Sequence, residues 1–144
     1  MTEVAFHFNA PDKVAYACRL LRKAVASQAR VVVTGPAELL HRLDLALWTF
    51  SPLDFVAHCM GDSPAQVLAA SPVVLVESVL ATPHQQVLLN LSDRVPDGFE
   101  RFERLIEVVT EDADDRNGAR DRWRHYAARG YAIERKDLEL KVPV

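Results

Sequence analysis

The fold of this chain is decided by residues 4–34, VAFHFNAPDKVAYACRLLRKAVASQARVVVT, close to its N-terminus. Over Val4–Phe8 the large apolar residues Val4, Phe6 and Phe8 alternate with Ala5 and His7, which is the two-residue period of a β-strand. From Lys13 the apolar positions recur every three or four residues, which is the spacing of one face of an amphipathic helix. Arg30–Thr34 is then a short run dominated by β-branched residues, typical of a strand covered on both faces in a parallel sheet. A strand, a helix and a strand in this order predict a right-handed crossover.

The rest of the chain repeats this alternation. Pro36 suits the first turn of a helix that we expect to run to about Trp48. Further strands are predicted at residues 55–60, 72–76, 86–91 and 106–109. A short helix is expected from Pro96 to Leu105, and a longer one from Ala113 to Gly130. We therefore predict an α/β fold of three layers around a mainly parallel sheet.

Length and composition indicate one globular domain over residues 1–144, in which residues 132–144 are expected to form a partly flexible C-terminal extension. With 49% hydrophobic residues the chain can build a real core. It has no apolar run long enough to cross a membrane, and its first residues do not resemble a signal peptide, so we expect a cytoplasmic protein. The two cysteines, Cys18 and Cys59, are expected to be reduced and buried.

The sequence carries no recognisable catalytic or cofactor motif. Its five glycines are too scattered for a phosphate-binding loop, and the loop at residues 34–37 has no lysine to reach a phosphate. The five histidines show no spacing typical of metal ligands, and no serine lies in a nucleophile elbow. We therefore expect no cofactor and no metal, and favour a binding module. A nucleotide-binding α/β enzyme is the alternative, and ATP binding by the isolated chain would support it.

The predicted C-terminal helix combines an aromatic face with a basic rim. Trp123 lies on that face, Arg120 and Arg124 flank it four residues apart, and Arg122 lies on its opposite border. Residues 116–136 contain seven basic and two acidic residues, although the net charge of the chain is -3. A basic patch on an acidic protein favours a small acidic partner. Two alternatives stay open: direct binding of single-stranded DNA through this helix, and a solvated helix face without a partner.

A second candidate surface lies on the helix that is predicted to end near Trp48. At 100° per residue Trp48 falls beside His41, Asp44 and Leu45, on the polar side of the helix. An exposed tryptophan next to an exposed leucine predicts a partner surface, because tryptophan is enriched among the anchors of interfaces. The alternative is that a later loop folds over Trp48.

Two blocks of the sequence are recognisable together. The first is RLDLALW at residues 42–48, followed by FVAH at residues 55–58. The second is RDRWRHY at residues 120–126, which leads to Gly130-Tyr131. Both resemble characteristic blocks of the chi subunit of bacterial DNA polymerase III. The order of the predicted elements also fits, so the resemblance covers nearly the whole chain.

This resemblance implies a non-enzymatic accessory subunit of the clamp-loader assembly, with a nucleotide-binding-like topology that lacks the nucleotide site. Chi proteins pair with the psi subunit and bind the acidic C-terminal tail of single-stranded DNA-binding protein, so contact with DNA is expected to be mostly indirect. A helicase is implied as a further partner at the psi-binding surface. No membrane partner is implied.

Carried over residue by residue, the resemblance implies two sites. The psi-binding positions fall on Leu45, Trp48 and Phe55. The tail-binding positions fall on Val109, Arg120, Trp123 and Arg124. The chain departs from the family where Trp123 and Arg124 replace the usual Tyr-Lys and where Ala57 stands in place of a frequent proline. Arginine keeps the charge and adds a planar fork for carboxylates, whereas tryptophan keeps the aromatic wall without the hydroxyl.

Overall fold

The computed structural model describes residues 1–49, 56–80 and 82–138. In this part of the chain seven strands form one sheet in the order β3-β4-β2-β5-β6-β1-β7, and every neighbouring pair is parallel. The strands are β1 (Glu3–Ala10), β2 (Val31–Thr34), β3 (His58–Met60), β4 (Val73–Val76), β5 (Val87–Asn90), β6 (Arg104–Thr110) and β7 (Ile133–Asp137). The helices are α1 (Lys13–Ala26), α2 (Ala37–Thr49), α3 (Ala65–Ala70), η1 (Phe99–Arg101, one 3-10 turn) and α4 (Ala113–Ala128).

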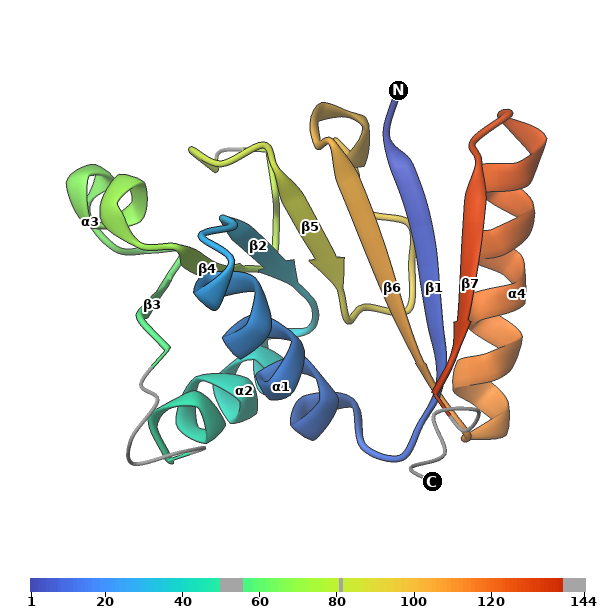
Figure 1. The fold of residues 1–144 in the computed structure, drawn as a ribbon, viewed down its shortest axis with the longest axis horizontal. Helices are drawn as coiled ribbons and strands as arrows, with labels where there is room; N and C mark the ends of the chain where they lie inside the picture. Colours follow the sequence, from blue (N-terminus) through green and yellow to red (C-terminus); the bar gives the residue numbers. More distant parts are fainter. Residues whose placement is uncertain (50–55, 81, 139–144) are drawn as a thin grey trace.

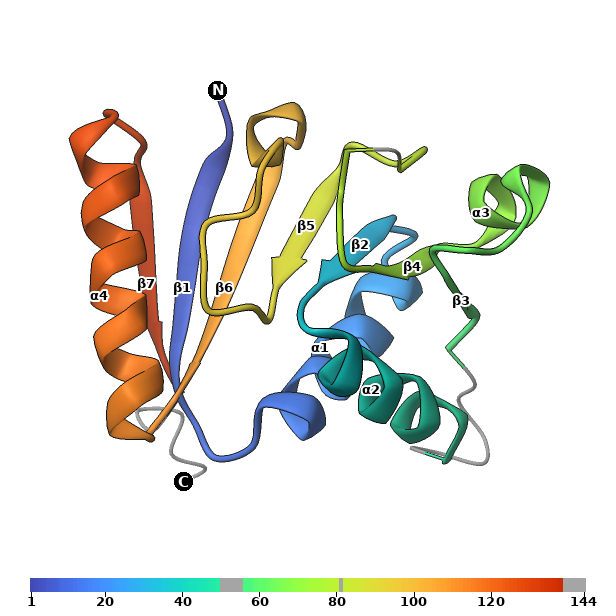
Figure 2. The ribbon, with the colours of Figure 1, turned by 180° about the vertical axis from the view of Figure 1, so that it is seen from behind.

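Helices cover both faces of the sheet. α1 and α2 lie against one face and α4 lies against the other (Figures 1 and 2). One apolar cluster joins α1 and α2 to the sheet through side chains such as Leu21 and Leu43, and a second joins α4 through Phe6 and Tyr126. The predicted α/β fold of three layers with a parallel sheet is therefore confirmed. No helix in the described residues is both long enough and apolar enough to cross a membrane.

Most predicted elements are found close to their expected bounds. The predicted amphipathic face of α1 is buried, and the Asp12 carboxylate caps this helix by accepting a hydrogen bond from the Ala15 amide at 2.9 Å. The predicted helix at residues 96–105 shrinks to the single turn η1, because β6 begins at Arg104. Helix α3 was not predicted. The strand predicted at residues 55–60 is described from His58 onward as β3, and residue 55 lies outside the described part.

The C-terminal strand β7 was also missed by the sequence analysis. It pairs in parallel with β1, from Val4 opposite Ile133 to Phe8 opposite Asp137, and so becomes the edge of the sheet. Charged side chains are common on such edge strands because they discourage pairing with another chain. The segment expected as an extension, residues 132–144, therefore begins with a strand, and residues 139–144 lie outside the described part.

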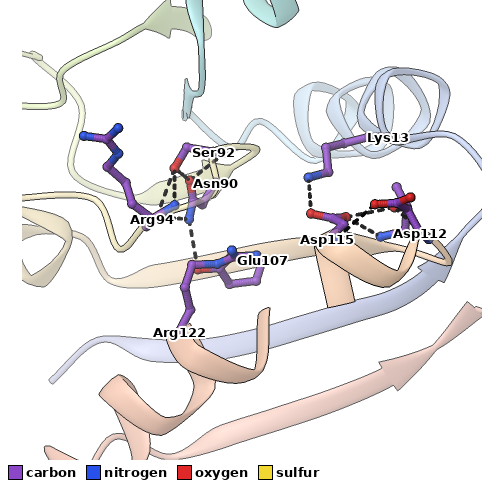
Figure 3. Close-up of polar contacts among 9 residues, drawn as sticks. Lys13, Asn90, Ser92, Arg94, Glu107, Asp112, Asp115 and Arg122 are labelled. Carbon is purple, nitrogen blue, oxygen red and sulfur yellow. Dashed lines mark hydrogen bonds and ion pairs between the residues drawn. The ribbon is translucent and has the colours of Figure 1, made fainter. Parts of the chain in front are cut away.

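A buried polar cluster fixes α4 to the sheet. The side chain of Glu107, in the middle of β6, is completely buried and accepts hydrogen bonds from Arg122 Nε at 3.0 Å, the Tyr126 hydroxyl at 2.6 Å and Asn90 Nδ2 at 2.9 Å. Figure 3 shows Asn90 and Arg122 beside this carboxylate. Burial raises the pKa of Glu107, although the three partners act to lower it. Burial and the neighbouring Glu107 also raise the pKa of Tyr126, so its hydroxyl stays protonated and donates.

The prediction that Arg122 lies at the border of the exposed helix face is wrong. Its side chain is only 3% exposed, because the guanidinium forms an ion pair with the buried Glu107. The same contact explains the glycine inside α4. A Cβ atom at Gly118 would approach Arg122 Nη1 to 3.3 Å, so glycine leaves room for the guanidinium. The dipeptide Asn117-Gly118 is common in turns, and a glycine inside a helix costs roughly 1 kcal/mol relative to alanine. The packing of Arg122 outweighs both effects, so the helix continues through this point.

Removing Arg122 tests the importance of this cluster. Arg122→Ala leaves the Glu107 carboxylate buried without its counter-charge, so we expect the free energy of unfolding in urea to fall by about 3–5 kcal/mol. Arg124→Ala is the control on the same helix, because its ion pair with Asp121 is largely exposed and should contribute under about 0.5 kcal/mol. Equal losses in the two variants would contradict the assigned role of the cluster.

Asp115 connects the start of α4 to two other elements. Its carboxylate accepts hydrogen bonds from the backbone amide of Thr110 at 2.8 Å, the Thr110 hydroxyl at 2.9 Å and Lys13 Nζ at 3.0 Å (Figure 3). Burial alone would raise the pKa of Asp115, but the hydrogen bonds from Thr110 and Lys13 outweigh it and hold the pKa below its usual value. The ionised carboxylate therefore stabilises the contact of α4 with the end of β6 and with α1.

This pKa predicts a pH dependence of stability. Because the folded pKa of Asp115 is lower than the unfolded one, its contribution is fully present above pH ~4 and is lost as the pH falls through the folded pKa. Asp115→Asn should lower the free energy of unfolding by about 1–2 kcal/mol at pH 7. The difference from wild type should shrink when urea unfolding is repeated below pH ~4. A difference that persists or grows on acidification would rule out this linkage.

Candidate functional site

An open pocket of about 480 Å³ lies beside α4, between this helix and the strands β1, β6 and β7. All four predicted tail-binding residues line it: Val109, Arg120, Trp123 and Arg124. They come from two elements, the end of β6 and the middle of α4. The structure thus brings together in one concave surface the residues that the sequence placed on separate elements.

The floor of this pocket is apolar. Val109 and Phe6 are almost completely buried there, and the half-buried indole of Trp123 packs on Phe6 with ring centroids 5.0 Å apart. Trp123 carries the predicted aromatic face of the helix at the protein surface, whereas Tyr126 is fully buried in the core. An apolar side chain of a ligand could therefore lie against the indole and Val109.

The rim of the pocket is basic. Arg120 and Arg124 are exposed, and each forms a hydrogen bond to a neighbour on its own helix: Arg120 donates to Asn117 Oδ1 at 3.1 Å, and Arg124 to Asp121 Oδ1 at 3.2 Å. Exposed pairs of this kind contribute little to stability. Both guanidinium groups can therefore turn to an incoming carboxylate without much loss.

Two further arginines line the pocket, Arg116 from the first half of α4 and Arg135 from β7. The carbon Cζ of Arg135 lies 5.1 Å from the centroid of the Phe8 ring and 5.9 Å from that of Trp123, within the range of cation–π attraction. Four arginines thus line the pocket, and no described residue that lines it is acidic. Arg135 is one of the seven basic residues counted in the sequence, but its place in the pocket depends on β7, which was not predicted.

The second predicted surface lies on α2, toward the other end of the sheet from α4 (Figure 1). The side chain of Trp48 is 59% exposed and that of Leu45 is 55% exposed. The Trp48 ring packs edge-on against the buried ring of His58, with centroids 5.3 Å apart, and His58 Nε2 lies 2.8 Å from Asp44 Oδ1. The indole is thus supported from β3 and remains accessible. Phe55, the third predicted residue of this surface, lies outside the described part of the chain.

The crevice where a nucleotide would bind in such a sheet is lined by acidic side chains, which do not suit a phosphate group. Ligands of parallel α/β sheets bind beyond the carboxyl ends of the strands, where the strand order reverses, here between β2 and β5. A pocket of about 620 Å³ exists there, but three of its lining residues are acidic: Glu77, Asp93 and Asp97. Carboxylates repel phosphate, so this pocket does not support the nucleotide-binding alternative. Within the described residues no group of acidic, histidine or cysteine side chains could hold a metal ion.

Comparisons with known proteins show the family of this chain. A family model described as DNA polymerase III chi subunit, HolC, matches residues 1–134. The chain is also 30% identical over 139 residues to a DNA polymerase III subunit chi from Pseudomonas aeruginosa, covering 93% of this chain and 95% of that protein. The chain therefore belongs to the family of the DNA polymerase III chi subunit, a non-catalytic accessory subunit of the replicative polymerase.

Proposed function

We propose that this chain links the psi subunit of the clamp loader to the acidic C-terminal tail of single-stranded DNA-binding protein during DNA replication. Membership of the chi family supplies the setting. The observation that carries the proposal is the pocket beside α4, where four arginines surround an apolar floor and no acidic residue lines it in the part of the chain that the structure describes. The chain would act in the cytoplasm as an adaptor and would need no cofactor.

The chemistry of the pocket fits the end of an acidic peptide. Arg120 and Arg124 would bind the terminal carboxylate and nearby aspartates of the tail, because a guanidinium can hold a carboxylate with two parallel hydrogen bonds. The terminal apolar side chain would lie on Trp123 and Val109. Such a small contact should have a dissociation constant of about 1 μM and should weaken with salt.

Direct DNA binding through α4 is less well supported. Arg122, one of the basic residues counted for it, is buried in its ion pair with Glu107 and so is removed from the surface. Four of the five remaining arginines of the patch, Arg116, Arg120, Arg124 and Arg135, line a hollow with an apolar floor. That geometry suits one chain end better than a continuous backbone of phosphates.

Reversing one charge in the pocket tests tail capture. Arg124→Glu should weaken binding of a tail peptide at least about tenfold by calorimetry, because a charge-assisted hydrogen bond of about 1.5–3 kcal/mol becomes a repulsion. Arg129→Glu makes the same charge change at the exposed C-cap of α4, which does not line the pocket, and should leave the affinity nearly unchanged. Equal affinities for Arg124→Glu and wild type would eliminate this site.

The other proposed surface binds psi through Trp48 and Leu45, with Phe55 as a further member. The exposure of two large apolar side chains on one helix supports this assignment, since such anchors dominate interface energies. A helicase is proposed as a second partner at the same surface. It would then compete with psi for this chain.

Truncating the indole tests this surface. Trp48→Ala should abolish co-purification with psi, because the central anchor of the interface is lost. Leu80→Ala removes an apolar side chain of similar exposure elsewhere on the molecule, and this variant should still co-purify with psi. The proposal fails if the psi complex of Trp48→Ala is recovered in the same yield as that of Leu80→Ala.

A further inference from the structure

A second basic groove lies on the opposite face of the same sheet edge. Among the described residues no helix covers β1 and β7 on the side that faces the reader in Figure 1, and α1 packs on this side next to β6. A groove of about 440 Å³ runs between α1 and the end of β7. The alternation of a β-strand places Lys136 on this side, whereas Arg135 lies on the side of the α4 pocket.

The walls of this groove carry four cations. Arg19, Arg22 and Lys23 come from α1, where all three are exposed, and Lys136 comes from β7. Among the described residues that line the groove, none is acidic. Since the chain as a whole has a net charge of -3, this local excess of positive charge would attract an anionic partner specifically to the groove.

The groove also has an apolar wall, formed by Tyr16, Leu20 and Leu138. The Tyr16 ring is half-buried, and its hydroxyl lies 2.6 Å from His7 Nδ1, which holds the ring in place. The pairing of an aromatic side chain with a row of cations is the usual composition of sites that bind single-stranded nucleic acids, in which bases stack and phosphates pair with the cations.

We propose that the groove between α1 and β7 binds single-stranded DNA, with phosphates on Arg19 and Lys23 and the bases against Tyr16. These two cations are spread along the helix, with a rise of about 6 Å from Arg19 to Lys23, instead of converging on one hollow as in the α4 pocket. That rise corresponds to about two nucleotides of one strand, because each nucleotide adds about 3.4 Å. A strand of phosphates therefore matches the groove better than a single carboxylate terminus does.

This inference does not depend on tail capture, because the two sites use different residues on opposite faces of the sheet edge. If both are correct, the chain holds the tail on one side of β7 and DNA on the other. The groove then supplies the direct contact with DNA that the α4 pocket is not built to make.

The test measures fluorescence anisotropy of a labelled 15-nucleotide oligo(dT) with the full chain, at several salt concentrations. We expect binding at low salt, and the double variant Arg19→Glu/Lys23→Glu should weaken it at least about tenfold. The plot of log affinity against log salt should become less steep by about 1.4 when two phosphate contacts are lost from a single strand. Circular dichroism would check that α1 still folds.

Two controls carry the same charge change. Arg42→Glu/Arg94→Glu alters exposed residues outside the groove, and Arg120→Glu/Arg124→Glu alters the α4 pocket. Affinity for DNA should fall clearly less in both than in the groove variant. The proposal is overturned by absence of binding at low salt, by equal losses in the three variants, or by a loss confined to the α4 variant. It is also overturned if the groove variant loses affinity for the acidic tail peptide but keeps its affinity for DNA.

Discussion

The carboxylate of Glu107 is the point on which the arrangement of α4 depends. It lies on the same face of β6 as Val109, two residues later, and it binds Arg122 and Tyr126, which are one helical turn apart. Once Arg122 points into the sheet, the angle of 100° per residue turns its neighbour Trp123 toward the pocket. The buried ion pair thus sets the rotation of α4 about its axis, and with it the position of the binding groups on its surface.

The same arrangement separates a buried charge from exposed ones. Arg122 pairs with Glu107 through Nε inside the protein, whereas Arg120 and Arg124 contact exposed neighbours on their own helix. Three arginines of one helix therefore lie in two different environments. Buried pairs resist exchange because breaking them leaves an uncompensated charge, and exposed pairs exchange readily because water screens them.

Much of the sheet could be predicted, because strands such as Val31–Thr34 and Val73–Val76 are covered on both sides and leave continuous apolar runs. β7 could not be predicted, because Ile133–Asp137 is mostly charged and becomes a strand only through its pairing with β1. This miss also hid the place of Arg135 in the pocket. Helical spacing placed Trp123 correctly but misplaced Arg122. The burial of Arg122 depends on its ion pair with Glu107 from β6, and the spacing of residues within one helix cannot indicate a contact with a strand.

The order of the strands also has a consequence for biosynthesis. β1 leaves the ribosome first, yet both of its neighbours, β6 and β7, come from the last third of the chain. The strands β2 to β5 are synthesised consecutively and pair mainly among themselves, so that half of the sheet can assemble during translation. The half that carries both basic surfaces must wait until β6 and β7 have emerged, and such long-range pairing is slow. A nascent chain therefore acquires its cationic surfaces only after β7 has been synthesised.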